Sequence, residues 1–318
     1  MNTFDSPQGA LGFLTSNLSY VAQEVLKQPY PDVKYPRFLN VDTAANEWAD
    51  SVIYRTLDMK GRPRKLGTGA NDGANAEIVG GTHSVKVEHY EFGFEYTIVE
   101  LGKAQLIAQN DRSAGINYLS EKALAARTLT EQFLDEVAMI GDSESQFSTG
   151  MLNNADVDSV TTGTLLGGAS QTIAQILDQA DKEDAAADML KVLQGAVSKV
   201  REDTKGTFTP NLVILPLAQY GRVNSFRIPN TAETLVGYLE RVLNVKIDWS
   251  NYAADVDGNG DIMMVTTRDN YSKFHLPKPF ALLPANTPDN VRFTSAGIVG
   301  VGGTDLQVPK AHLYVTGI

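Results

Sequence analysis

The sequence predicts an α+β fold in which a long helix and an extended hairpin accompany a compact domain of alternating helices and strands. The first observation is an amphipathic pattern that runs from Ile116 to Ile140. The second is a pair of strand-like segments, 51–58 and 83–92, separated by a long polar loop. The third is the alternation of helix-like and strand-like segments over roughly 170 to 285. At 318 residues the chain is long enough for two domains.

The first fifty residues predict an extended arm. Their apolar side chains, among them Phe13, Val25 and Trp48, are scattered between prolines, and this spacing fits neither a long helix nor a regular strand. Such an arm cannot bury its own apolar residues. We therefore expect it to lie across its own body or across a neighbouring chain.

The segments 51–58 and 83–92 predict the two strands of a hairpin. In the second segment Val85, Val87 and His89 alternate with polar or larger residues, as in a half-buried strand. The loop between the segments begins at Lys60 with basic residues and then becomes rich in glycine. An isolated hairpin is only marginally stable in water, so we expect this one to need a partner surface.

One long helix is predicted after the hairpin. Its apolar positions recur every three or four residues; they are Leu119, Ala123, Ala126, Leu129, Phe133, Val137 and Ile140. Gly141 and Asp142 end the pattern. Twenty-five residues make a rod of about 37 Å, which is longer than the usual helix of about three turns. We expect this helix to act as a structural spine.

The compact domain is predicted from a helix over Leu190 to Val200, a strand over Leu212 to Pro216, and a helix over Leu235 to Val242. Two strands follow, Val245 to Trp249 and Ile262 to Thr266. The final segment, Val291 to Ile318, returns to an alternating strand pattern.

The composition excludes several classes of protein. Without cysteine the chain has no disulfide, thiolate zinc site, iron–sulfur cluster or cysteine nucleophile. Its net charge of −11, from 27 basic and 38 acidic residues, argues against a protein that wraps nucleic acid. No apolar run reaches the roughly 20 residues that a membrane span needs, and the N-terminus carries no basic signal region. We expect a soluble protein made in the cytoplasm.

Several local motifs, together with the order of the elements, carry a family resemblance. The motifs are Glu95-Tyr96-Thr97 with Glu100-Leu101 and Ala104, Ile140-Gly141-Asp142, Gly150 to Asn154, Thr207 to Pro216 with Tyr220, Ile228 to Thr231, and Gly302 to Tyr314 with Gly317-Ile318. This series resembles the major capsid proteins of tailed bacteriophages, which have the Hong Kong 97-type fold. The resemblance covers most of residues 50 to 318.

The resemblance implies a division of the chain. An N-terminal arm covers 1–50, an extended loop 51–95, a peripheral domain with the spine helix 96–169, and an α/β axial domain 170–288. The C-terminal strands, 289–318, return to the peripheral domain.

The resemblance also implies a function without catalysis, cofactor or metal. The chain would assemble with itself as hexamers and pentamers into an icosahedral shell. This shell would enclose double-stranded DNA without binding a specific sequence, and it would have no contact with a membrane. A portal and separate scaffolding or decoration proteins are further expected partners. We expect the chain in the virion, after synthesis in the cytoplasm of a bacterial host. The alternatives are an encapsulin-like nanocompartment around a cargo enzyme and, more remotely, a calcium-dependent hydrolase.

The hydrolase alternative depends on the loop from Asp255 to Asp261, which spaces oxygen ligands like the first half of a calcium loop. The twelfth position is Thr266 where a calcium loop has a bidentate glutamate, and a strand follows instead of a helix. We therefore interpret this segment as a solvated turn and predict no structural calcium.

Other residue types also predict structural roles. The four histidines, His83, His89, His275 and His312, match no zinc motif, and His83 and His89 would lie about 20 Å apart along one strand. The carboxylates between Asp178 and Asp188 fit the solvated first turn of a helix. No nucleophile elbow or phosphate-binding loop occurs.

One charge cluster predicts an interface between subunits. Four basic residues lie at the tip of the predicted loop: Lys60, Arg62, Arg64 and Lys65. The alternative is a loop whose charges only keep it solvated. We expect the basic tip to pair with acidic residues on the spine helix of a neighbouring subunit, near Glu131, Asp135 and Glu136. Each exposed pair contributes only about 0–1 kcal/mol, so an effect on assembly depends on repetition over many copies.

Overall fold

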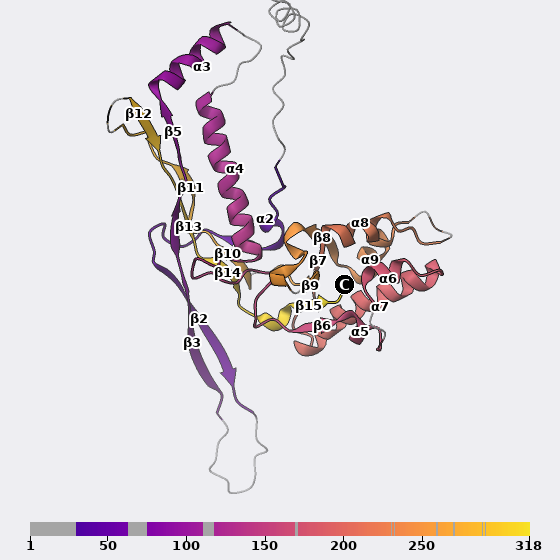
Figure 1. Ribbon diagram of the computed structural model, residues 1–318. Helices are drawn as coiled ribbons and strands as arrows, with labels where there is room; N and C mark the ends of the chain where they lie inside the picture. Colours follow the sequence, from indigo (N-terminus) through magenta and orange to yellow (C-terminus); the bar gives the residue numbers. More distant parts are fainter. Residues whose placement is uncertain are drawn as a thin grey trace, which may run out of the picture.

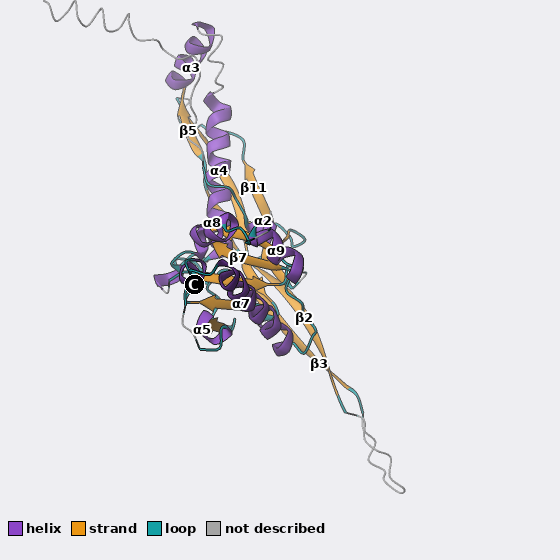
Figure 2. Ribbon diagram, turned by 90° about the vertical axis from the view of Figure 1, so that its right-hand side faces the viewer, coloured by secondary structure: helices purple, strands orange, loops and turns teal. Residues whose placement is uncertain are grey.

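The computed structural model has a compact lobe, an elongated part and a projecting hairpin (Figure 1). It describes residues 30–62, 75–110, 118–168, 171–229, 231, 233–258, 260–269, 271–287, 289 and 291–318. The compact lobe holds helices α5 to α9 around one sheet, and the elongated part holds α3, α4 and three smaller sheets. The hairpin leaves the elongated part in the direction opposite to α3 and α4 (Figures 1 and 2).

The hairpin consists of β2 (Ser51–Lys60) and β3 (Glu77–Lys86), paired antiparallel over their full lengths. The expected single strand over 83–92 is wrong, because the chain leaves the hairpin at Lys86. Val87 is buried and its N–H donates to the carbonyl of Asp50, and β4 (Glu88–Glu91) then pairs with a different strand, β13. An alternating pattern continues through such a break because both strands have period two.

The spine helix α4 covers Tyr118–Met139. One face is buried, through Ala126, Thr130, Leu134 and Val137. The helix ends where Gly141 takes a φ of 81°, a left-handed conformation that favours glycine. A Cβ at this position would lie 2.4 Å from the carbonyl oxygen of Phe147, so the close return of the chain also requires glycine. A second helix, α3 (Ile98–Asn110), precedes the spine and was not predicted.

The compact lobe is built on a five-stranded sheet with the order β6-β15-β9-β7-β8. Its strands are β6 (Ser159–Thr161), β15 (Leu313–Thr316), β9 (Ile262–Thr266), β7 (Leu212–Pro216) and β8 (Lys246–Ser250). Its helices are α5 (Thr162–Leu165), α6 (Ile173–Leu177), α7 (Lys182–Asp203), α8 (Leu217–Ser225) and α9 (Leu235–Leu243). The helix and strand segments predicted between 190 and 266 are all found here.

The two faces of this sheet belong to two hydrophobic cores. Val213 of β7 and Val265 of β9 pack against α6, α7 and α9. Their neighbours Ile214 and Met264 face the other way and share a core with the C-terminal end of the spine helix. Because alternate residues point to opposite faces, a strand buried on both sides must be apolar throughout, as β7 and β9 are.

The elongated part contains three small sheets, with the orders β1-β10-β14, β11-β13-β4 and β12-β5. Their further strands are β1 (Asn40–Asp42), β5 (Phe94–Thr97), β10 (Ser272–His275), β11 (Lys278–Leu282), β12 (Arg292–Ser295), β13 (Gly297–Val301) and β14 (Gly303–Leu306). Short helical turns complete the chain at α2 (Tyr35–Phe38), η1 (Asn251–Ala253), η2 (Val256–Gly258) and η3 (Pro309–Ala311).

The last strand corrects the expectation that residues 289–318 return together to the peripheral domain. β12, β13 and β14 join the elongated part, but β15 lies between β6 and β9 in the compact lobe. Leu313 and Val315 pack against the helices of this lobe, whereas Tyr314 faces the other core. Burial on both faces holds this strand in the central sheet.

The predicted arm lies partly outside the described residues, since these begin at residue 30. From there the chain lies against its own body: Tyr35 and Phe38 of α2 are buried, and β1 pairs parallel to β10. Within the described residues no helix combines the length and apolar character needed to span a membrane.

Candidate assembly surfaces

One face of the hairpin is largely apolar, and none of the described residues covers it. Ile53, Leu57 and Met59 of β2 lie two or four residues apart, so they share a face, which also carries Arg55, and Ile78 of β3 is directly opposite Met59. Their exposed fractions are 63%, 75%, 83% and 67% respectively. The hairpin projects away from the body, and no other element in the described part of the chain lies beside its outer half (Figures 1 and 2). An apolar strand face of this kind marks a contact with another molecule.

An apolar groove lies on the elongated part, between the spine helix and β4. It has a volume of about 290 Å³, and the residues that line it are Tyr90, Glu91, Phe92, Leu129, Thr130, Phe133 and Val299. Phe92 and Leu129 are 43% and 41% exposed. Tyr90 and Phe133 form an edge-to-face pair at 4.9 Å between ring centroids, which fixes the shape of the groove floor.

The basic tip is described only in part. Lys60, at the end of β2, and Arg62 are both exposed, and Lys60 lies opposite Glu77 in the hairpin register. Arg64 and Lys65 lie outside the described residues.

The three acidic residues predicted as its partners are not equivalent. Glu136 is exposed, whereas Glu131 is half-buried and accepts a hydrogen bond of 3.2 Å from the hydroxyl of Tyr35. Asp135 is 5% exposed and accepts the backbone N–H groups of Lys34 and Tyr35 at 3.0 and 2.7 Å. Burial raises the pKa of the Asp135 carboxyl despite these hydrogen bonds. The expectation that Asp135 faces a neighbouring subunit is therefore wrong, because it caps α2 within its own chain.

A buried lysine joins the same region to the compact lobe. The Nζ of Lys34 lies 3.0 Å from the Oδ1 of Asp248 and 3.2 Å from the ring centroid of Trp249. The Lys34 side chain is 5% exposed. The ion pair and the cation–π contact together satisfy a charge that would otherwise be costly to bury. Sequence reasoning missed this contact, because 214 residues separate its two charged partners.

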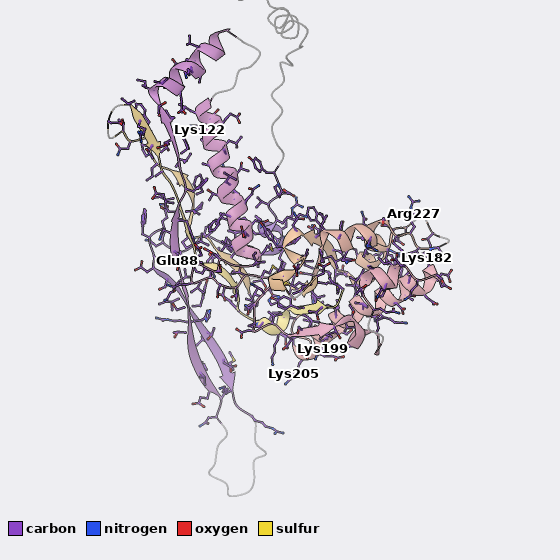
Figure 3. The ribbon with its side chains drawn as sticks, viewed as in Figure 1. Glu88, Lys122, Lys182, Lys199, Lys205 and Arg227 are labelled. Carbon is purple, nitrogen blue, oxygen red and sulfur yellow. The ribbon has the colours of Figure 1, made fainter. Side chains whose placement is uncertain are left out.

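A lysine of the spine helix contacts β5 and α3 near the outer end of the elongated part. The Nζ of Lys122 on the spine helix, labelled in Figure 3, donates to the carbonyl of Glu95 at 2.6 Å. It also lies 3.8 Å from the carboxylate of Glu100. These contacts hold the spine helix against β5 and the start of α3.

The loop from Asp255 uses its carboxylates to hold its own turn. Asp261 accepts the N–H of Asp255, and Asp255 accepts the N–H of Gly260, both at 3.3 Å. Asp255 and Gly258 both take positive φ, as expected in a tight turn. In the described part of the chain, no three histidine or acidic side chains are placed to hold a metal ion together.

The four histidines have different surroundings. His89 is exposed and stacks on Trp48 at 5.5 Å. His83 is on the hairpin, and His275 is buried near its base. His312 is 1% exposed, and its Nδ1 lies 2.7 Å from the hydroxyl of Thr266.

We predict that His312 makes the protein less stable in acid. Burial lowers its pKa from 6.5 to about 4, so the unfolded chain takes up a proton between these values and the folded chain does not. The contribution of His312 to the free energy of unfolding is therefore complete above about pH 6.5, and up to about 3 kcal/mol of it is lost as the pH approaches 4. Urea unfolding of the unassembled chain across this range measures the effect. His312→Gln should remove this part of the pH dependence, and His89→Gln, the exposed control, should retain it; equal slopes in both variants would contradict the assignment.

Comparisons with known proteins agree on one family. The family model described as "Major capsid protein" matches residues 61–318. The structure is similar to the capsid of Myoviridae phage XM1, with a TM-score of 0.77 at 18% identity over 95% of this chain and 98% of that one. It is also similar to a structure from Mycobacterium phage Bobi, with a TM-score of 0.62 at 12% identity over 98% and 97% of the two chains. The capsid of a native GTA particle matches at 0.59 and 12% identity over 99% and 98%. No curated protein matches the sequence.

Proposed function

Because the chain belongs to the major capsid protein family and has the Hong Kong 97-type fold, we propose that it assembles as hexamers and pentamers into the icosahedral shell of a tailed phage. The shell encloses double-stranded DNA. The similar structures are capsids of phages and of a GTA particle, so neither the nanocompartment nor the hydrolase is favoured. The role is structural, and the chain itself carries out no reaction.

The uncovered apolar face of the hairpin is the observation that carries this proposal. A two-stranded hairpin with one apolar face is marginal on its own and becomes stable when that face is covered. Within one chain the hairpin points away from the apolar groove beside the spine helix (Figure 1). We therefore place the hairpin of one subunit in the groove of the next, with Leu57 and Met59 against Phe92 and Leu129.

This contact joins two different surfaces of the same chain. Such a heterologous contact propagates from subunit to subunit and closes into a ring when the rotation permits it. Rings of six and five copies are the units that tile an icosahedral shell. A portal would replace one pentamer, and scaffolding or decoration proteins would bind the inner or outer surface of the shell. Synthesis in the host cytoplasm is consistent with a chain free of cysteine.

The experiment is electron microscopy of the chain expressed alone and purified by size-exclusion chromatography. Closed shells, sheets, tubes, or separate rings of six and five subunits support the proposal. A chain that remains a monomer at high concentration, also in the presence of a crowding agent, contradicts it.

The basic tip adds an electrostatic contribution to this contact. We place Lys60, Arg62, Arg64 and Lys65 near Glu131 and Glu136 of the neighbouring spine helix, without Asp135. Contributions of about 0–1 kcal/mol for each exposed pair are screened by salt. Reversing all four basic charges should slow shell formation at low salt, as measured by light scattering, and the difference from the unchanged protein should shrink at high salt. Equal rates at low salt would contradict the pairing.

A further inference from the structure

The base of the hairpin holds a cluster of titratable side chains. Tyr54 of β2 and His83 of β3 are opposite each other in the hairpin register, and both reach the sheet β1-β10-β14. The Tyr54 hydroxyl lies 2.5 Å from the Nε2 and 2.9 Å from the Nδ1 of His275 on β10. The Nε2 of His83 lies 3.6 Å from the Oδ1 of Asp305 on β14. One residue from each hairpin strand is thus attached to the body.

Asp305 is shared between two imidazoles. Its Oδ2 lies 3.7 Å from the Nε2 of His275, while its Oδ1 faces His83. The Asp305 side chain is 7% exposed and that of His275 is 1% exposed. The Oδ2 of Asp305 also accepts a hydrogen bond of 3.3 Å from the Nε2 of Gln307. Asp305 is therefore a nearly buried carboxylate whose ion-pair partners are the two imidazoles, because Lys273, its direct neighbour across β10 and β14, directs its ammonium to Asp42.

The second carboxylate of the cluster already has a permanent cation. Asp42 of β1 lies 3.3 Å from the Nζ of Lys273 and 3.7 Å from the Nδ1 of His275. Burial opposes ionisation of Asp42, but the N–H of Ala44 and the Lys273 ammonium outweigh it and keep its pKa below the usual range. With both histidines neutral, the cluster has two negative charges and one positive charge. Protonation of His275 balances these charges, and protonation of His83 adds a cation on the hairpin itself.

We propose that Tyr54, His83, His275, Asp42, Lys273 and Asp305 form a protonation-dependent lock that sets the direction of the hairpin. When the histidines are protonated, ion pairs with Asp305 add to the hydrogen bond of Tyr54 and hold both hairpin strands on the body. When the histidines are neutral, these ion pairs are lost, and the hydrogen bond of Tyr54 and the contact of the Lys273 ammonium with the Tyr54 ring, 5.7 Å from its centroid, remain. Histidine is the side chain that changes charge near neutral pH. The pair of His275 and Asp305 is shielded from water, where opposite charges attract strongly, whereas the pair of His83 and Asp305 is partly exposed and weaker.

The lock has a large effect at the far end of the hairpin. Six residues of strand separate Tyr54 from Lys60, a length of roughly 20 Å. A rotation of about 10° at the base therefore moves the tip by roughly 3–4 Å. If the hairpin binds a neighbouring subunit as in the proposed function, a movement of this size determines whether its apolar face reaches the groove of that subunit. All six residues of the lock are in one chain, so the lock does not depend on assembly.

A distance measurement between two spin labels tests the lock on unassembled chains. The protein has no cysteine, so labels can be placed at Lys60→Cys on the hairpin and Glu202→Cys on α7, both exposed positions. The background carries Leu57→Asp and Met59→Asp, which prevent subunit contacts through the hairpin face. We expect the distribution of distances to be about twofold wider at about pH 8 than at about pH 5.

Matched variants separate the lock from a general effect of pH. His83→Arg places a permanent cation opposite Asp305 and should give the narrow distribution at both pH values. Asp305→Asn should give the wide distribution at both, and His89→Gln, an exposed histidine outside the cluster, should respond like the parent. Because the side chain of His83 is 60% exposed, its replacement leaves the hydrophobic core unchanged. A parent whose distribution has the same width at both pH values, or a His83→Arg variant that responds like the parent, overturns the lock without bearing on shell assembly.

Discussion

Replacing Leu57 and Met59 together by aspartate is expected to abolish shell formation and leave a folded, unassembled chain. These side chains are 75% and 83% exposed, so their replacement costs the single chain little. In the proposed contact each would be covered by a neighbour. Covering a side chain of this size contributes about 1.5–3 kcal/mol, and a buried unpaired carboxylate adds a further penalty. The loss recurs at every contact of the shell.

Size-exclusion chromatography and electron microscopy measure this effect, with circular dichroism as the check on folding. The matched control places two aspartates on the other face of the same hairpin, Thr56→Asp with Val79→Asp. Both double variants add two negative charges, but only the first pair lies on the apolar face. Assembly of the Leu57 and Met59 variant at the rate of the unchanged chain would refute the contact, and so would equal impairment of the control.

Asp248→Ala is expected to cause the largest loss of stability from a polar substitution. Asp248 pairs with the Nζ of Lys34, whose side chain is 5% exposed. Removing the carboxylate leaves an ammonium group buried beside Trp249 without its hydrogen-bonded anion. Breaking a buried ion pair in this way costs about 3–5 kcal/mol. Lys34 joins the start of the described arm and α2 to the compact lobe. The substitution should therefore weaken the packing of the arm and α2 against that lobe.

Urea unfolding of the unassembled chain measures this loss, and two comparisons define its origin. Asp203→Ala breaks the pair of Lys199 and Asp203 on α7, whose side chains are 43% and 25% exposed, and should cost at most about 1 kcal/mol; Lys199 is labelled in Figure 3. Lys34→Met combined with Asp248→Leu replaces the buried pair by apolar side chains and should cost less than Asp248→Ala alone. A double variant that is less stable than the single one would show that the pair itself, and not the unpaired charge, determines the result.

Local patterns in the sequence were sufficient for most individual elements. The spine helix, α7 and α9 have an apolar period that matches a helix, and β7 and β9 are short continuous apolar runs of the kind found in buried strands. The stop at Gly141 was also readable, because only a glycine tolerates both the positive φ and the close return of the chain. These features depend on neighbouring residues. The alternation that places Ile53, Leu57 and Met59 on one face was present in the sequence as well, and it was the signal from which the apolar face could have been found.

Contacts between distant segments depended on the tertiary structure alone. The break at Val87 follows from pairing with β13, which is some 200 residues later in the chain. The place of β15 beside β6 and β9, the pairing of Lys34 with Asp248 and the two histidines around Asp305 have the same origin. The fate of Asp135 shows the physical reason most directly. From the sequence alone, a carboxylate on a helix is predicted to be a solvated charge. In the structure, residues 34 and 35 pack against the spine helix, bury Asp135 and donate two backbone hydrogen bonds to it. The sequence by itself therefore determined which elements form, and the three-dimensional packing decided which polar groups serve the fold and which surfaces remain for other copies of the chain.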